Sequence, residues 1–135
     1  MKEILFRTIT AHAEALTCGE YTSELLVRAF LERICERNAA INAYLFVDEQ
    51  GAIEAARASD ERRKNGACLG VLDGIPYALK DNIAAKGLQM TCGSRILEGY
   101  ISPYDATVTE RLRASGAVLL GKTNMDEFAM GSSGE

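Results

Sequence analysis

An amphipathic helix is predicted after Thr22, the expected N-cap. Its apolar positions recur at four-residue spacing with apolar neighbours beside them: Leu25, Leu26, Ala29, Phe30 and Ile34. Tyr21 precedes the cap and can pack on Leu26 as a hydrophobic staple. The pattern fades near Asn38, where we expect the helix to end.

Two further helices are predicted before residue 66. A weaker pattern covers residues 4–16, and a stronger one covers residues 49–64, whose last turn is Arg-Arg-Lys. Cations in a last turn complement the helix dipole, and Asn65-Gly66 supplies a left-handed stop. Residues 43–47 form a short apolar run that suits either a strand or a buried turn.

After Gly66 the pattern changes to short apolar runs separated by glycines. Residues 77–79 predict a strand, and the unbroken apolar run 117–120 predicts a strand buried on both faces. Asp105 is the expected cap of a helix between them that ends at Ser115-Gly116. Strand, helix and strand in this order predict an α/β fold with a parallel pair joined by a right-handed crossover.

Composition supports a single globular unit and excludes several functions. The 135 residues are 47% hydrophobic and 25% charged, with a net charge of -4, so no basic surface for nucleic acid is expected. There is no apolar stretch of transmembrane length and no secretory signal, which predicts a cytoplasmic protein without membrane contact. The four cysteines form no metal-binding or redox pair, so we expect reduced, mostly buried thiols: Cys18, Cys35, Cys68 and Cys92.

Lys80 is the first candidate for chemistry, because it follows the apolar stretch 75–79. Burial at the end of a strand removes hydration from an ammonium and favours the neutral amine, which can accept a proton. The alternative is a structural lysine whose stem lies on the sheet while its charged head reaches water. Spacing alone favours this alternative.

Residues 116–123 match the phosphate-binding pattern G-x-x-x-x-G-K-[ST]. A true P-loop needs its four middle residues in a loop whose N–H groups surround phosphate, and a strand must precede it. Here the middle residues are the predicted buried strand 117–120, and Gly116 follows a helix. We therefore interpret this match as coincidental.

The remaining candidates are weaker. Asp126 and Glu127 are adjacent, so they do not face each other as an acid/base pair and fit the first turn of a short helix. Residues 131–134 suit a loop at the mouth of a pocket or an ordinary surface turn. A nucleophilic Cys92 would need His12, the only histidine, and nothing in the sequence brings the two together; the single histidine equally limits a Ser-His-Asp site.

Four blocks of sequence resemble the amidase signature family. Within that family they are similar to the A subunits of aspartyl/glutamyl-tRNA amidotransferases, and the resemblance extends over about residues 22–135. The blocks are GIPYALKDN at 74–82, TCGS at 91–94, YDATV at 104–108 and GKTNMDEFAMGSS at 121–133.

The resemblance implies a fold and a catalytic mechanism. The fold would be the N-terminal part of the amidase-signature fold, with helices packed around a mixed, largely parallel sheet. The family uses a Ser–Ser–Lys triad with a bridging serine in a cis peptide, and Lys80 matches its lysine. Its two serines lie downstream of residue 135, so we expect a piece of a longer enzyme, inactive by itself. Met130, Gly131, Ser132 and Ser133 are expected to line the glutamine pocket.

The resemblance also implies partners. Such an enzyme hydrolyses glutamine and passes ammonia to a B subunit, which uses ATP and magnesium to amidate Glu-tRNA(Gln) or Asp-tRNA(Asn); with a third, C-type partner these subunits form a heterotrimer. No cofactor or metal is expected in this chain. The alternatives are another amide hydrolase of the same family, a P-loop nucleotide-binding protein, and a non-catalytic interaction module that uses the helical half.

Overall fold

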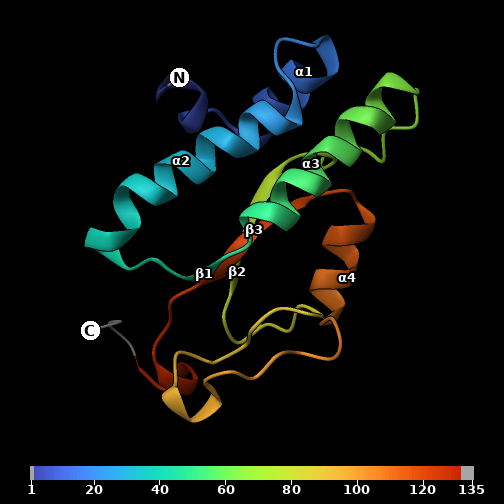
Figure 1. Ribbon diagram of the computed structural model, residues 1–135. Coiled ribbons are helices and arrows are strands. Elements are labelled where there is room, and N and C mark those ends of the chain that lie inside the picture. The colour runs from blue at the N-terminus through green and yellow to red at the C-terminus, as the bar shows by residue number, and fades with distance from the viewer. Residues whose placement is uncertain (1, 132–135) are drawn as a thin grey trace.

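The computed structural model describes residues 2–131, which form an α/β fold around a mixed three-stranded sheet (Figure 1). The central strand β3 is parallel to β2 and antiparallel to β1. In chain order the elements are η1 Lys2–Phe6, α1 Ile9–Cys18, α2 Ser23–Ile41, β1 Tyr44–Val47, α3 Glu49–Lys64, β2 Pro76–Lys80, η2 Arg95–Leu97, α4 Thr107–Ala114, β3 Val118–Thr123 and η3 Glu127–Ala129, where η denotes a 3₁₀ turn.

Side-chain caps set the starts of the long helices. The Thr22 hydroxyl accepts from Leu25 N–H at 3.1 Å, which confirms the predicted cap of α2. The predicted bounds of α3 are also confirmed. The end of α2 was predicted too early, since the helix continues to Ile41 and stops at Asn42 in the left-handed conformation. Asn38 lies inside the last turn, and its amide exchanges two hydrogen bonds with the backbone of Tyr44.

Two other predicted helices differ in detail. The first was expected over residues 4–16, but the chain forms η1 and then α1, because Thr8 is extended and caps α1 by accepting from Ala11 N–H. Asp105 was predicted to cap α4, yet Ala106 occupies the N-cap position without a side-chain bond. The Asp105 carboxylate instead accepts from Lys86 N–H and from the Arg113 guanidinium.

The sheet carries an apolar core on each face. Helices α2 and α3 lie side by side over one face (Figure 1), where Val27, Leu31 and the α3 alanines meet Val118 and Leu120. The predicted stripe on α2 was therefore wrong in part: Leu25 is exposed, while Val27 and Leu31 face the core. On the other face, the loop after β2 contributes Ala85 to a second cluster with Leu79 and Leu119.

Strand β3 approaches β1 closely at Gly121. Val47 lies opposite Gly121 in this pairing, and Phe46 lies opposite Lys122. A Cβ at residue 121 would collide with the Phe46 carbonyl oxygen and lie 2.9 Å from the Val47 Cα. Residue 121 must therefore be glycine for the central strand to pair on both sides.

A partly buried ion pair lies near the amino end of β2. The Asp73 side chain is fully buried and accepts two hydrogen bonds from the Arg62 guanidinium at the end of α3. It also accepts from Leu69 N–H. Burial alone would raise the pKa of Asp73, but these hydrogen bonds and the adjacent cation bring its pKa below the usual value.

His12 is buried between α1 and α2 against Tyr21 and Phe30, and its Nδ1 lies 2.8 Å from the Tyr21 hydroxyl. Burial and the nearby Arg7 charge lower the pKa of His12. The folded state therefore binds this proton less readily than the unfolded state, so stability is lost as pH falls below the ordinary His value of about 6.5.

We expect the thermal midpoint to drop more between pH 8 and pH 5.5 in the parent than in His12→Phe, which calorimetry would check. Equal drops would contradict this.

Within the described residues, no helix has the length and apolar character needed to cross a membrane. The same residues contain no cluster of three or more His, Cys, Asp or Glu side chains able to hold a metal ion. None of the four cysteines is in a disulfide. The prediction that most of them are buried was wrong for this chain: Cys92 is half-buried and the other three are exposed.

Candidate functional site

The carboxyl ends of the parallel strands lie next to each other. Lys80, the last residue of β2, is opposite Thr123, the last residue of β3. Each strand is followed by an irregular segment, the long loop 81–106 and the shorter segment 124–131. In α/β sheets, ligands bind outside the carboxyl ends of the strands, where such loops gather. This edge of the sheet is therefore the candidate functional site.

Lys80 lies at this edge, as the sequence predicts, but it is exposed. The expectation that the strand itself dehydrates the amine was wrong for the described chain. Alternation along β2 explains the difference, since Leu79 points into the core beneath the sheet and its neighbours Ala78 and Lys80 point away from it. Ala78 and Lys80 are both exposed, so no described element covers their side chains at this end of β2.

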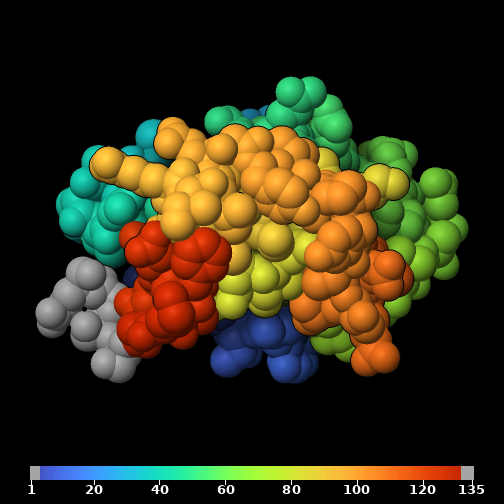
Figure 2. All heavy atoms as spheres, turned by 90° about the horizontal axis from the view of Figure 1, so that it is seen from below, coloured from blue at the N-terminus to red at the C-terminus, as the bar shows by residue number. Residues whose placement is uncertain are grey.

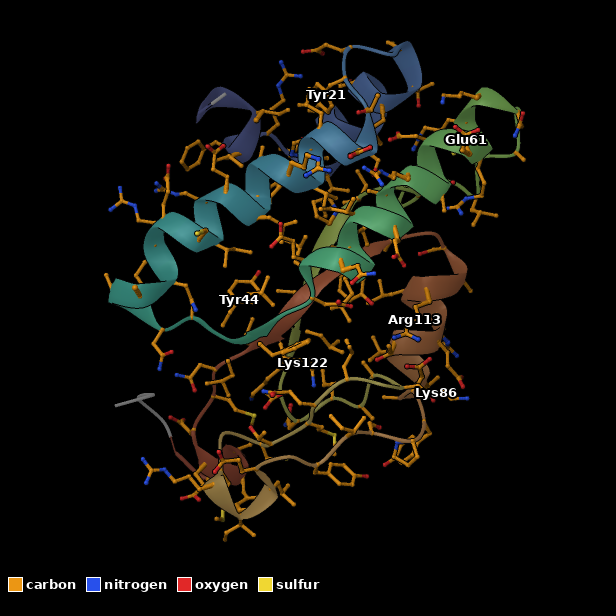
Figure 3. The ribbon with its side chains drawn as sticks, in the orientation of Figure 1. Tyr21, Tyr44, Glu61, Lys86, Arg113 and Lys122 are labelled. Carbon is orange, nitrogen blue, oxygen red and sulfur yellow. The ribbon has the colours of Figure 1, made fainter. Side chains whose placement is uncertain are left out.

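Asp81 and Lys122 form a fully buried ion pair directly beside Lys80. The Lys122 ammonium donates to Asp81 Oδ1 at 3.0 Å and to the Gln89 carbonyl oxygen at 3.1 Å, and both side chains are inaccessible to solvent. Figure 3 shows Lys122 between the sheet and the loop that follows β2. Asp81 Oδ2 accepts from both the N–H and the hydroxyl of Thr91.

The turn at residues 91–94 is hydrogen-bonded to the segment that follows β3. The Cys92 carbonyl oxygen accepts from Phe128 N–H, and the Ser94 hydroxyl donates to Glu127 at 2.6 Å. Gly93 has φ +66°, and a Cβ there would lie 2.7 Å from the Met125 carbonyl oxygen. Figure 2 shows the two segments packed together, with the red segment after β3 against the orange part of the loop after β2.

The predicted pocket residues are only partly described. Met130 is 81% exposed and follows η3, next to Gly131. Ser132 and Ser133 lie outside the described residues, so their predicted place in a glutamine pocket stays a prediction. Asp126 and Glu127 do begin a short helical turn, and the Glu127 carboxylate accepts a hydrogen bond from the Ser94 hydroxyl.

The P-loop match at residues 116–123 is coincidental, as the sequence predicts. Residues Val118–Thr123 are strand β3, and Gly116 follows helix α4. The lysine of the pattern, Lys122, is paired with Asp81 and has no accessible surface.

We therefore expect no nucleotide binding by this pattern. Titration of the chain with Mg²⁺-ATP should release no heat of binding up to millimolar concentration, since the N–H groups a phosphate would need belong to the sheet. Saturable binding that disappears in Lys122→Ala would contradict this expectation.

The cysteine-nucleophile hypothesis gains no support from the structure. His12 packs against Tyr21 and Phe30 between α1 and α2, whereas Cys92 lies in the loop after β2 against Asp81 and Phe128. The two residues belong to different parts of the fold.

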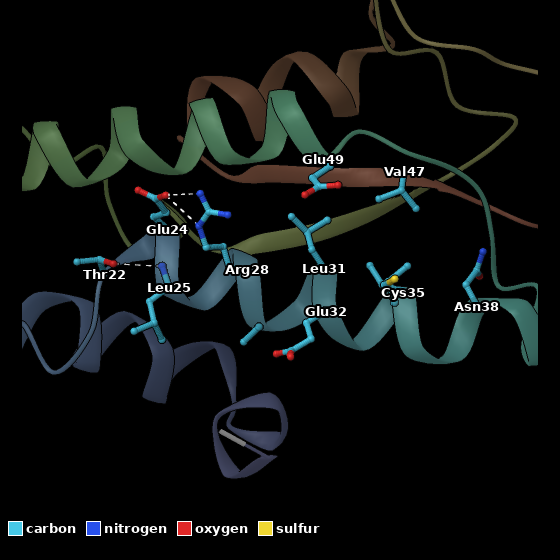
Figure 4. A pocket seen from close by; sticks show the side chains of 12 residues that line it. Thr22, Glu24, Leu25, Arg28, Leu31, Glu32, Cys35, Asn38, Val47 and Glu49 are labelled. Atoms are coloured by element: carbon cyan, nitrogen blue, oxygen red, sulfur yellow. Dashed lines mark hydrogen bonds and ion pairs between the residues drawn. The ribbon is translucent and has the colours of Figure 1, made fainter.

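A groove of about 880 Å³ lies along α2, away in the sequence from this edge (Figure 4). Its lining includes Leu25, Leu31 and Cys35, together with the ion pair of Glu24 and Arg28. Of the described residues that the sequence singles out for amidase chemistry, Lys80, Met130 and Gly131 do not line it, so we assign it no role in the candidate site.

Comparison with known proteins identifies the family. The family described as Amidase matches residues 25–135. The chain belongs to the amidase family. The TCGS turn, the Lys80 strand and the buried Asp81–Lys122 pair all lie within the matched residues.

Three curated relatives that are similar over nearly the whole chain are A subunits of glutamyl-tRNA(Gln) amidotransferases. The one from Acidothermus cellulolyticus is 50% identical over all 135 residues, which are 27% of that protein. The one from Chloroflexus aurantiacus is 53% identical over 135 residues, or 28% of its length, and the one from Myxococcus xanthus is 52% identical over 95% of this chain and 26% of its own. The chain thus spans about a quarter of these relatives.

Solved amidases have the same fold in this region. Native peptide amidase from Stenotrophomonas maltophilia is 36% identical with a TM-score of 0.86, covering 91% of this chain and 26% of that one. An amidase family protein from Bacillus anthracis is 30% identical with a TM-score of 0.86, covering 93% and 25%. The α/β fold class and the amidase resemblance are both confirmed.

Proposed function

We propose that this chain is part of the glutaminase subunit of a Glu-tRNA(Gln) or Asp-tRNA(Asn) amidotransferase. The observation that carries the proposal is the identity of 50–53% with amidotransferase A subunits over 95% or more of the chain. Identity with the solved peptide amidase of the same fold is 36%. The proposed reaction is hydrolysis of the side-chain amide of glutamine to glutamate and ammonia.

Lys80 is the proposed proton carrier of this reaction. In a Ser–Ser–Lys triad the lysine takes a proton through a bridging serine while a second serine attacks the amide carbon of glutamine. The proton then goes to the departing ammonia, leaving an acyl-enzyme that water hydrolyses to glutamate. Both serines are proposed to lie in a part of the protein outside this chain, and that part would also cover the face on which Lys80 is exposed.

The ammonia is proposed to serve a second protein chain. A B subunit would activate the tRNA-borne carboxylate with ATP and magnesium, and a C subunit would complete a heterotrimer in the cytoplasm. The chain itself would hold neither cofactor nor metal. Met130, Gly131, Ser132 and Ser133 are proposed to line the glutamine pocket, since they follow the segment that docks on the turn at residues 91–94.

Another amide hydrolase of the family is the competing proposal, because the fold is shared with peptide amidase. The two proposals differ in whether the activity depends on partner subunits. A full-length protein containing this sequence should co-purify with the B and C subunits and, with glutamine and ATP, convert Glu-tRNA(Gln) or Asp-tRNA(Asn) to the amidated form. A full-length protein that hydrolyses small acyl amides alone and neither binds those subunits nor supports transamidation would refute the amidotransferase proposal.

A further inference from the structure

The proposed reaction does not use a fully buried lysine that lies near the site. Lys122 has no accessible surface, and its ammonium donates to the Asp81 carboxylate and the Gln89 carbonyl oxygen. Burying an ammonium is costly unless it is paired and hydrogen-bonded, and a hydrophobic side chain of similar volume is often as stable in such a place. The pair therefore suggests a role other than stability alone.

Asp81 connects three separate segments around the Lys80 position. Its N–H donates to the carbonyl oxygen of Thr123 at the end of β3, and its own carbonyl oxygen accepts from Cys92 N–H. Its carboxylate holds Thr91 with one oxygen and the Lys122 ammonium with the other. Because Asp81 is bonded directly to Lys80, these contacts fix where the backbone of Lys80 leaves the sheet.

The Lys122 side chain lies on the face of the sheet opposite to the Lys80 side chain. It is opposite Leu79 in the parallel register, and Lys80 is opposite Thr123. Successive side chains point to opposite faces of a sheet, so Lys122 shares the buried face of Leu79 while Lys80 points to the other face. The Lys122 ammonium therefore lies on the opposite side of the sheet from the Lys80 side chain, and its contact nearest to Lys80 is with Asp81.

We propose that Lys122 is a positioning residue for the reaction at Lys80: by neutralising and orienting Asp81, it holds the end of β2 and the turn at residues 91–93 in one fixed geometry. The inference rests on the proposed glutaminase function and concerns the same site. A catalytic group displaced by a fraction of an ångström loses rate and not substrate affinity, because the lost interaction belongs to the transition state.

Lys122→Met in a full-length protein that contains this sequence tests the inference. Methionine keeps most of the side-chain volume and removes the charge. We expect kcat for glutamine hydrolysis to fall about 100-fold while KM changes by less than about threefold.

Arg62→Met is the matched control. It also leaves a buried carboxylate, Asp73, without its cation, but at the amino end of β2, opposite the Lys80 end. It should lower the thermal midpoint as Lys122→Met does, yet keep kcat within about threefold of the parent.

The outcomes separate positioning from simple destabilisation. A folded Lys122→Met protein with kcat within about threefold of the parent would overturn the inference, and so would an equal loss of kcat in Arg62→Met. If Lys122→Met does not fold, Thr91→Val is the deciding variant, because it removes only the hydroxyl that donates to Asp81. A roughly tenfold lower kcat with an unchanged thermal midpoint supports the inference, and an unchanged kcat overturns it. A parent without glutaminase activity would refute the proposed function itself, whereas an active Lys122→Met refutes this inference alone.

Discussion

Replacing Lys80 by alanine in the full-length protein should abolish glutamine hydrolysis, with a loss of about 1,000-fold or more in kcat/KM. A positioned acid/base group contributes about 10²- to 10⁴-fold, and here the same amine would serve both proton transfers. The measurement is glutamate release, beside transamidation driven by added ammonium salt, which should persist because it bypasses the glutaminase.

Lys86→Ala is the matched control for this experiment. Lys86 is an exposed lysine in the loop after β2, and its backbone, not its ammonium, makes the hydrogen bonds to Asp105 and Arg113. Its loss should leave glutaminase activity near that of the parent. Comparable activity in Lys80→Ala and Lys86→Ala would remove Lys80 from the mechanism.

Gly121→Ala should have the largest effect on stability, lowering the free energy of unfolding by about 3 kcal/mol or more. The added Cβ would meet the Phe46 carbonyl and the Val47 Cα, which are backbone atoms of a paired strand and cannot move aside as a flexible side chain would. Overpacking of this kind typically costs about 1–3 kcal/mol, and the loss of pairing along β3 would add to it. Urea unfolding followed by circular dichroism measures the difference.

Gly66→Ala separates steric collision from backbone strain. Gly66 has φ +68°, so alanine is strained there, but nothing lies within 4 Å of the added Cβ. The expected cost is only about 1–2 kcal/mol, the ordinary penalty of a left-handed non-glycine residue. If Gly66→Ala destabilised the chain as much as Gly121→Ala, the close approach of β1 and β3 would not be the reason glycine is needed.

The local elements could be predicted from the sequence better than the way they pair. Thr22 and the run from Asp48 to Asn65 carry their own capping signals, so the starts of α2 and α3 and the end of α3 could be predicted. The parallel pairing of β2 and β3 followed from the strand–helix–strand order. The antiparallel pairing of β1 with β3 could not be predicted, because it joins segments far apart in the chain through Gly121, whose role appears only when Phe46 is beside it.

Only part of the candidate site could be predicted, because the rest depends on contacts between segments far apart in the chain. Lys80 was found because it ends an apolar strand and lies in a family motif. Its exposure agrees with the alternative that spacing alone favours, and the sequence could not decide between the two because exposure depends on which face of the sheet is covered. The partnership of Lys122 and Asp81 was missed entirely. One signal was available: Lys122 follows the buried apolar run 117–120 with only Gly121 between, so a buried ammonium there needs an acidic partner.

The most direct test of the proposed function is the release of glutamate and ammonia from glutamine by a full-length protein that contains this sequence. We expect equimolar release of the two products, with glutamine preferred over simple acyl amides and with turnover that depends on Lys80. Rapid hydrolysis of acyl amides without release of glutamate from glutamine would contradict it.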